Sequence, residues 1–512
     1  MTKEPPASPD HEGAFGWPPS GWAAVLATVG VLTALRLAWL AAVPLDLYGD
    51  EAQYWVWARE PAFGYYSKPP LVAWAIALST ALLGDGEFAV KLPSALFHAG
   101  TALVLYRIGR DLDPDGTPAR GAAVGFWAAA LWATMPAVSL SALIISTDPP
   151  LLLFWALALH AILRGVRAGG VRAGGGLGWW AAAGLWVGLG LLSKYAMGYF
   201  LLSAAIGLAL TPALRPLLWR RLPVTAGIAL LLLLPNVLWN LANGFATFRH
   251  TGDNANLGGR LFNPGELLEF AAAQFAVFGP VPMVLLLLAL AACRGRGAGA
   301  GRRLVAAFVW PTLAIALAIA FLSRAHANWA APAYVGATVL VAAWAVERGW
   351  RRLLAWTAAA HLLLAATVMA APPLLRHAGY ELPSRFDPWR RVRGWSDLGR
   401  AVTELRRQHP QAGLLVDSRL TLASLVYYVR PFAFDVVKWN PDGVASDHFE
   451  LTTRLEPGTG QGFVLITARP DPTDILARFE RWQPLGAIVT PIGPDRDRRY
   501  HAFLVQGFRG YR

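Results

Sequence analysis

The chain has 512 residues, of which 55% are hydrophobic and only 15% are charged. Soluble domains carry roughly 25% charged residues, so this composition excludes an ordinary soluble globular protein. Apolar runs of about 18–24 residues, long enough to cross a hydrocarbon core of roughly 30 Å, recur along the chain and predict a polytopic α-helical membrane protein. The single cysteine, Cys293, excludes an internal disulfide.

The first twenty residues are polar and rich in proline. Their one basic residue, Lys3, is accompanied by three acidic residues, which is unlike the basic start of a cleavable signal peptide. We therefore expect residues 1–20 to form a short disordered cytoplasmic tail.

About eleven membrane spans are expected in residues 21–372. They fall at about 21–43, 88–108, 121–142, 149–163, 179–192, 196–210, 222–238, 267–291, 304–322, 329–346 and 353–371. The apolar segment 69–83 is too short to cross, so we expect a juxtamembrane helix there. Pro69 and Pro70 suit its first turn.

Basic residues are distributed unevenly between the two sets of links. The links after the even-numbered spans hold sixteen Lys and Arg residues, whereas the opposite links hold seven over a longer total length. The positive-inside rule places the first set in the cytoplasm. Residues 46–87 and everything after residue 372 are then periplasmic, and the net charge of +13 needs no nucleic-acid partner.

Two glycine-rich links, residues 168–178 and 295–301, lie on the cytoplasmic side. Neither contains the Gly-x-x-x-x-Gly-Lys pattern of a phosphate-binding loop. We expect flexible linkers there.

The composition becomes polar and mixed from about Pro372, which predicts a periplasmic α/β domain over residues 373–512. Ser396 is expected to cap a helix that carries Leu398, Val402 and Leu405 at helical spacing. Strands are expected at 413–416, 433–437 and 462–467, helices at 422–429 and 474–482, and a closing hairpin pairs 487–491 with 502–506.

The stretch from residue 46 to residue 71 is the most informative part of the chain. Asp50 and Glu51 stand side by side just beyond the first span, among aromatic residues that include Tyr54 and Tyr66. Lys68 follows seventeen residues after Glu51, in a Lys-Pro-Pro sequence. The stretch is either an interfacial loop whose aromatic rings lie in the headgroup belt, or a site for a polar group attached to a lipid.

Further polar residues lie at span ends on the same outer face. They are Asp148, Lys194, Arg249, His250, Arg324, His326 and Asn328. Each alone could be a helix cap, a snorkelling lysine or a solvated loop residue. Their common face, opposite the arginine-rich links, indicates a polar site outside the membrane.

Several short motifs resemble those of one enzyme family. Asp50-Glu51-Ala52 precedes Lys68-Pro69-Pro70-Leu71, and Lys91-Leu92-Pro93-Ser94-Ala95, Thr147-Asp148-Pro149 and Leu189–Lys194 follow. Over residues 20–350 the chain resembles the polyprenyl-phosphate-sugar-dependent glycosyltransferases (family 39-like), which include lipid A aminoarabinose transferases, rhizobial core galacturonosyltransferases and protein O-mannosyltransferases. The resemblance implies a GT-C fold in the bacterial inner membrane with a periplasmic active site.

The chemistry of such a transfer agrees with the residues available. A lipid phosphate is already a good leaving group, and cations stabilise it as it departs; Lys68, Lys194 and Arg324 are the candidates. An acceptor hydroxyl needs a base, for which Asp50 is the first candidate and Glu51 its rival, while Asp148 could orient the acceptor or a lysine. Further substrate contacts are expected from Tyr54, Tyr66, Arg249, His250, His326 and Asn328.

The expected donor is a polyprenyl-phosphate-linked sugar, with no sugar nucleotide. The expected acceptor is a hydroxyl or phosphate group of lipid A, lipopolysaccharide core, another glycan or a protein. The sequence departs from the aminoarabinose enzymes at Ser67, where those enzymes have a glutamate that contributes to a metal site. No cofactor is therefore certain; Glu51, His250 and His326 are either a replacement metal site or free polar residues.

Two other classes of function remain open from the sequence. A transporter or flippase for a lipid-linked sugar would also have many spans and a polar outer cavity. A structural or assembly membrane protein could instead use the C-terminal domain as a docking module.

Overall fold

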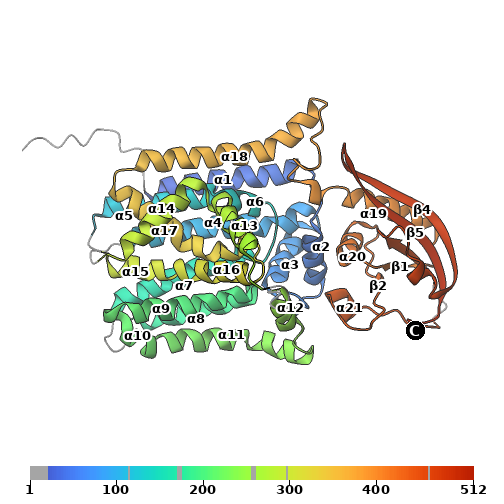
Figure 1. Cartoon of the computed structure of the whole chain (residues 1–512), viewed down its shortest axis with the longest axis horizontal. Helices are drawn as coiled ribbons and strands as arrows, with labels where there is room; N and C mark the ends of the chain where they lie inside the picture. The colour runs from blue at the N-terminus through green and yellow to red at the C-terminus, as the bar shows by residue number, and fades with distance from the viewer. Residues whose placement is uncertain are drawn as a thin grey trace, which may run out of the picture.

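The computed structural model describes residues 21–112, 116–169, 176–254, 261–295, 298–458 and 462–511. The expected N-terminal tail, residues 1–20, lies outside them. A long bundle of helices ends in a separate sheet-containing domain, and the short helices α2 (Gly49–Arg59), α3 (Leu71–Leu83) and α12 (Ala246–Asn254) lie where the two meet (Figure 1). The chain therefore has a helical part and a smaller α/β part, as predicted.

Seven helices of the described chain are long and apolar enough to cross a membrane. They are α1 (Trp22–Ala42), α4 (Glu87–Arg110), α7 (Asp148–Gly169), α11 (Leu222–Ala242), α15 with α16 (Ala300–Leu322), η3 with α17 (Ala327–Glu347) and α18 (Arg351–His377). Two further pairs, each bent by more than 40°, raise the number to nine if each pair counts as one span.

The bent pairs differ from the straight spans that the sequence analysis expected. The segment expected at 267–291 divides into α13 (Pro264–Phe278) and α14 (Pro280–Cys293), which meet at 105°. Gly279 has a φ of 98° and Pro280 lacks a backbone N–H, so the helix cannot continue through them. The other pair joins α9 (Gly198–Leu210), which agrees with the span expected at 196–210, to α10 (Arg215–Arg220) in the expected link, with a 113° bend.

Two other expected spans also differ in length. The segment expected at 121–142 breaks before Pro136 into α5 (Pro118–Thr134) and α6 (Pro136–Ser141). The segment expected at 179–192 is the short apolar helix α8 (Leu177–Ser193). The total of eleven crossings therefore stays a prediction.

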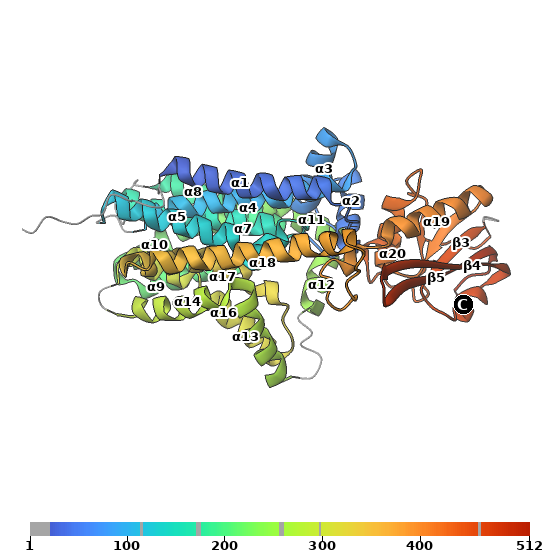
Figure 2. The ribbon, with the colours of Figure 1, turned by 90° about the horizontal axis from the view of Figure 1, so that it is seen from above.

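Burial separates the centre of the bundle from its outside. Of the most apolar stretch of each helix, 89% is buried for α17 but only 17% for α11 and α18. Figure 2 shows α1 and α18 running along the length of the bundle. Helices α11 and α18 carry exposed leucines. Such side chains suit a lipid-facing surface, because in a membrane they contact acyl chains and not water.

The C-terminal domain is built on a five-stranded sheet of order β2-β1-β3-β5-β4. Its strands are β1 (Gly413–Val416), β2 (Val437–Lys438), β3 (Phe463–Thr467), β4 (Phe479–Gly493) and β5 (Arg496–Phe508). β1 is parallel to β2 and β3, whereas β5 is antiparallel to β3 and β4. β1 and β3 are buried throughout, which explains their continuous apolar sequences.

The helices of this domain are α19 (Trp395–Gln408), α20 (Arg419–Tyr428), α21 (His448–Thr452) and α22 (Thr473–Leu476). The expected β1, β3 and α20 are confirmed, and the closing hairpin forms, although residues 487–491 pair with 497–501 rather than with 502–506. The expected helix 474–482 is wrong, because α22 ends at Leu476 and Trp482 pairs with Val505 in the hairpin. The expected strand 433–437 is reduced to β2, which begins at Val437.

The expected cap of α19 is also wrong, and its replacement connects the two domains. The helix begins after Gly394, and its first N–H groups, from Trp395 and Ser396, donate to Asp46 Oδ2 at 2.8 and 3.1 Å. Asp46 belongs to the loop after α1. A carboxylate on two N-terminal amides satisfies donors that the helix itself leaves unpaired. The helical bundle thus caps a helix of the C-terminal domain.

Candidate active site

A polar cavity of about 460 Å³ lies where the bundle meets the C-terminal domain. Nine of the twelve candidate residues line it: Asp50, Tyr54, Tyr66, Lys68, Asp148, Lys194, His250, His326 and Asn328. The predicted convergence of polar residues from distant parts of the chain is therefore present in the structure. Arg419, Ser446, Asp447 and His448 of the C-terminal domain complete the wall.

Helix α2 directs its two adjacent acidic residues to opposite environments. Consecutive residues of a helix point about 100° apart, so Asp50 and Glu51 can face different surroundings. Asp50 lines the cavity, whereas Glu51 is fully buried. Glu51 Oε2 accepts from Lys91 Nζ at 2.5 Å and from the N–H of Tyr48 at 2.8 Å, and Oε1 accepts from the N–H of Ile145 at 2.8 Å. Both carboxylate oxygens of Glu51 are therefore used in contacts that hold α2 against its neighbours.

Asp50 is paired with a residue that the sequence analysis missed. Its Oδ1 accepts a hydrogen bond from Nη1 of Arg419 at 2.8 Å, and the same Nη1 also donates to Gln53. Arg419 begins α20, directly after the carboxyl end of the parallel strand β1. In α/β sheets ligand-binding groups gather at that edge, which is the one signal in the sequence that could have indicated it.

Three separate elements meet at Asp148. This residue begins α7. Lys194, which lies between α8 and α9, donates a hydrogen bond to its Oδ1 at 2.7 Å. Asn328 of η3 donates to its Oδ2 at 2.6 Å. The ion pair fixes the Lys194 ammonium at the edge of the cavity. Asp148 is therefore paired with a lysine, while its role in orienting a lysine or the acceptor stays a prediction.

Lys68 is the cation of the cavity that lacks a carboxylate partner. Across the described ranges its ammonium makes no hydrogen bond or ion pair. Burial, followed by repulsion from Lys194, lowers the pKa of Lys68 below its ordinary value. A desolvated ammonium beside a second cation gains the most from a bound anion, so Lys68 is suited to holding a phosphate.

Neutral groups complete the lining. Burial, followed by the charge of Asp50, raises the pKa of Tyr54 well above its ordinary value, so its phenol stays protonated. Burial, followed by Lys68, lowers the pKa of His250, and burial lowers the pKa of His448 to about 4. These side chains can exchange hydrogen bonds with a sugar without adding charge.

Three of the candidate residues do not line the cavity. Besides Glu51, these are Arg249 of α12, which donates to the nearby Gly244 carbonyl, and Arg324, which is exposed. Among the described residues no three His, Cys, Asp or Glu side chains gather as metal ligands. Glu51, committed to Lys91 on the far side of α2, cannot join His250 and His326. These residues do not fit a metal site.

Comparisons with known proteins identify the family. Residues 67–239 match the family model described as dolichyl-phosphate-mannose-protein mannosyltransferase. Lipid A galacturonosyltransferase RgtD of Rhizobium johnstonii is 32% identical over 451 residues, which is 86% of this chain and 90% of RgtD. The chain belongs to the RgtD family of GT-C membrane glycosyltransferases. The expected enzyme class and family resemblance are confirmed.

More distant relatives agree in fold. An undecaprenyl phosphate-alpha-4-amino-4-deoxy-L-arabinose arabinosyl transferase of Pseudomonas aeruginosa is 28% identical over 195 residues, 35% of this glycosyltransferase and 33% of the relative. The crystal structure of ArnT from Cupriavidus metallidurans bound to undecaprenyl phosphate has 18% identity and a TM-score of 0.63, covering 95% of this chain and 98% of ArnT. The GT-C architecture is therefore shared along nearly the whole chain.

Proposed function

We propose that this glycosyltransferase moves a sugar from a polyprenyl phosphate to a hydroxyl or phosphate group of lipid A or a related acceptor. The observation that carries the proposal is the Lys68 ammonium, which lacks an ion-pair partner among the described residues and shares one cavity with Asp50. A phosphate site and a carboxylate are the two groups that this transfer needs. The names of RgtD and of the arabinosyl transferases support the acceptor and donor classes.

In the proposed reaction the bond between the anomeric carbon and the phosphate oxygen breaks. Lys68 and Lys194 stabilise the charge left on the polyprenyl phosphate, and the Asp148–Asn328 pair keeps Lys194 in position. The acceptor oxygen attacks the anomeric carbon and passes its proton to Asp50. No step requires a metal.

We further propose that the cavity is periplasmic and that the bacterial inner membrane surrounds residues 21–372. The described parts of the arginine-rich links, next to α5, α10 and α15, lie at the end of the bundle opposite the C-terminal domain, which supports this orientation. Counting α5 and α8 as crossings, and each bent pair as one, gives the eleven crossings expected from the sequence. Residues 46–87 and 373–512 are then periplasmic.

The purified protein should transfer sugar from a polyprenyl phosphate donor and not from a sugar nucleotide. Transfer to lipid A, to core oligosaccharide and to exported glycans can be compared by mass spectrometry of lipids from a deletion strain and a complemented strain. Transfer from a sugar nucleotide without a lipid carrier would refute the proposed donor. Accumulation of untransferred donor only on the cytoplasmic side of the deletion strain would instead indicate a flippase.

The pH dependence of donor binding tests Lys68. Because its pKa is lowered, the ammonium loses its charge at a lower pH than an ordinary lysine, and the donor KM should rise as the pH rises through that range. Lys68→Met should raise the KM about 10–100-fold near neutral pH, the equivalent of one charged hydrogen bond. Lys68→Arg keeps its charge at alkaline pH. It should therefore remove the alkaline rise; an unchanged rise would exclude Lys68 as its origin.

A further inference from the structure

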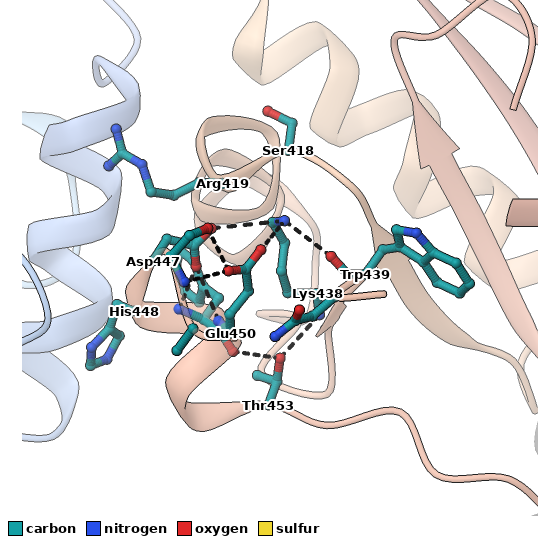
Figure 3. A network of polar contacts seen from close by, with 12 residues as sticks. Ser418, Arg419, Lys438, Trp439, Asp447, His448, Glu450 and Thr453 are labelled. Carbon is teal, nitrogen blue, oxygen red and sulfur yellow. Dashed lines mark hydrogen bonds and ion pairs between the residues drawn. The ribbon is translucent and has the colours of Figure 1, made fainter. Parts of the chain in front are cut away.

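Arg419 enters the active site from a different domain than the residues it contacts. It lies on α20 of the C-terminal domain, whereas Asp50 and Gln53, which accept hydrogen bonds from its Nη1, lie on α2. The side chains of Arg419 and Asp50 are 35% and 38% exposed, so the pair is open to the cavity. Figure 3 shows Arg419 extending toward the blue ribbon of the bundle, away from the polar network of its own domain.

The interface between the domains fixes α20 against α2. The hydroxyl of Tyr428 accepts from the N–H of Leu47 at 2.6 Å, and the hydroxyl of Tyr427 donates to the Asp85 carbonyl at 2.6 Å. The ring of Trp55, on α2, packs against that of Tyr427 at 4.9 Å. A Cβ on Gly49 would lie 2.7 Å from Leu420, so the first turns of the two helices are in direct contact. The position of Arg419 beside α2 is therefore fixed by the contacts of its domain with the bundle.

A buried network in the same domain holds the outer wall of the cavity. Lys438 is 7% exposed; its Nζ donates to Glu450 Oε1 at 2.8 Å and lies 3.8 Å from Asp447 Oδ2 (Figure 3). Glu450 in turn accepts from the N–H and hydroxyl of Ser446 at 2.7 and 2.6 Å. Tyr66, from the bundle, donates to the Ala445 carbonyl at 3.0 Å. The wall segment 446–448, together with the Ala445 that precedes it, is thus held by contacts from both domains.

The Arg419 contact leaves Asp50 one oxygen for chemistry. Oδ1 is used by Arg419, whereas Oδ2 makes no hydrogen bond with any described residue. A carboxylate held through one oxygen keeps a single orientation, and a base must be oriented within hydrogen-bond reach of the proton it removes. We propose that Arg419 is a positioning residue for Asp50, and that the C-terminal domain is thereby an integral part of the active site. This inference rests on the proposed role of Asp50 as the base.

A double-mutant cycle with the full-length enzyme tests this role. Arg419→Met should lower kcat about 10–100-fold and leave the donor KM within about twofold, because the guanidinium acts through Asp50 and not on the phosphate. In an Asp50→Asn background the same change should cost no further activity, since residues that act through one another are non-additive. Arg419→Lys, which keeps a charge near Asp50, should recover part of kcat. Arg400→Met, at a side chain of the same domain that is 79% exposed, is the matched control and should have no effect.

The other outcomes overturn the inference in distinguishable ways. An equal loss from Arg419→Met in both backgrounds, or a raised donor KM with unchanged kcat, would make Arg419 a direct ligand of the donor. Full activity of Arg419→Met would make the contact structural. If the wild-type enzyme transfers no sugar from a polyprenyl phosphate, or if Asp50→Asn is fully active, the proposed function itself fails. Detergent-stable monodispersity of each variant, compared with wild type, separates these results from misfolding.

Discussion

Replacing Asp50 with asparagine is expected to lower turnover about 10²–10⁴-fold, the usual contribution of a positioned general base. Asparagine keeps the size of the side chain, and its carbonyl oxygen can still accept from Arg419. The proton acceptor is nevertheless lost. Donor binding should change far less, because Lys68 and Lys194 provide the positive charge for the phosphate. Steady-state kcat and donor KM on the purified variant measure the two effects separately.

Asp447→Asn is the matched control for this variant. Asp447 also lines the cavity, but its carboxylate caps α21 by accepting from the N–H groups of Phe449 and Glu450 at 2.8 and 3.0 Å. An asparagine can make the same cap, and Lys438 keeps its closer partner Glu450 at 2.8 Å, so turnover should stay near the wild-type value. Equal losses from both substitutions would indicate a general effect of charge, and near-normal turnover of Asp50→Asn would refute the proposed base.

The sequence indicated the membrane half of this cavity because the polar residues follow one simple rule. Asp148 and Lys194 stand at the outer ends of predicted spans, and Asp50 and Lys68 lie in the loop after the first span; alternating topology brings these positions to one face. The rule does not need packing details. Residues from four separate parts of the chain could therefore be assigned to one face from the predicted topology alone.

Residues whose role depends on packing between domains could not be found in this way. Arg419 lies 369 positions after Asp50; its place after strand β1 could indicate a ligand-binding edge, but it does not indicate a partner in the bundle. The wall segment 446–448 is similar, because it lines the cavity only through the docking of the sheet domain. The predicted helix at 474–482 failed for a related reason: its residues from Phe479 onward pair as the edge strand β4, and that pairing is a tertiary contact.

The sequence contains residues that indicate the bends in the bundle, but hydropathy alone does not use them. Gly279-Pro280 and Met135-Pro136 interrupt apolar runs that are otherwise continuous. Hydropathy alone treats such a run as one span, whereas glycine and proline are the residues that allow a helix to end. Both breaks are now seen as helix boundaries in the structure.

The roles of Asp50 and Glu51 can be separated by a stability measurement. The ion pair of Glu51 with Lys91 is almost completely buried, with side-chain exposures of 0% and 2%. Removing one partner leaves a buried charge uncompensated, which typically costs roughly 3–5 kcal/mol. Out of a total stability of about 5–15 kcal/mol this is a large loss, so Glu51→Gln and Lys91→Met should each unfold at clearly lower temperature in detergent.

The double variant Glu51→Gln/Lys91→Met gives the decisive comparison. It removes both charges together, and replacing a whole buried pair by groups of similar volume is often neutral, so it should recover much of the stability lost by either single change. Arg400→Ala at the exposed pair with Asp397 is the control, with an expected change of about 0–1 kcal/mol. If Glu51→Gln unfolds like wild type yet loses turnover, Glu51 is the base and Asp50 is not. If the double variant is no more stable than the single variants, the contacts of Glu51 with Tyr48 and Ile145, rather than its charge pairing, are what stabilise the start of α2.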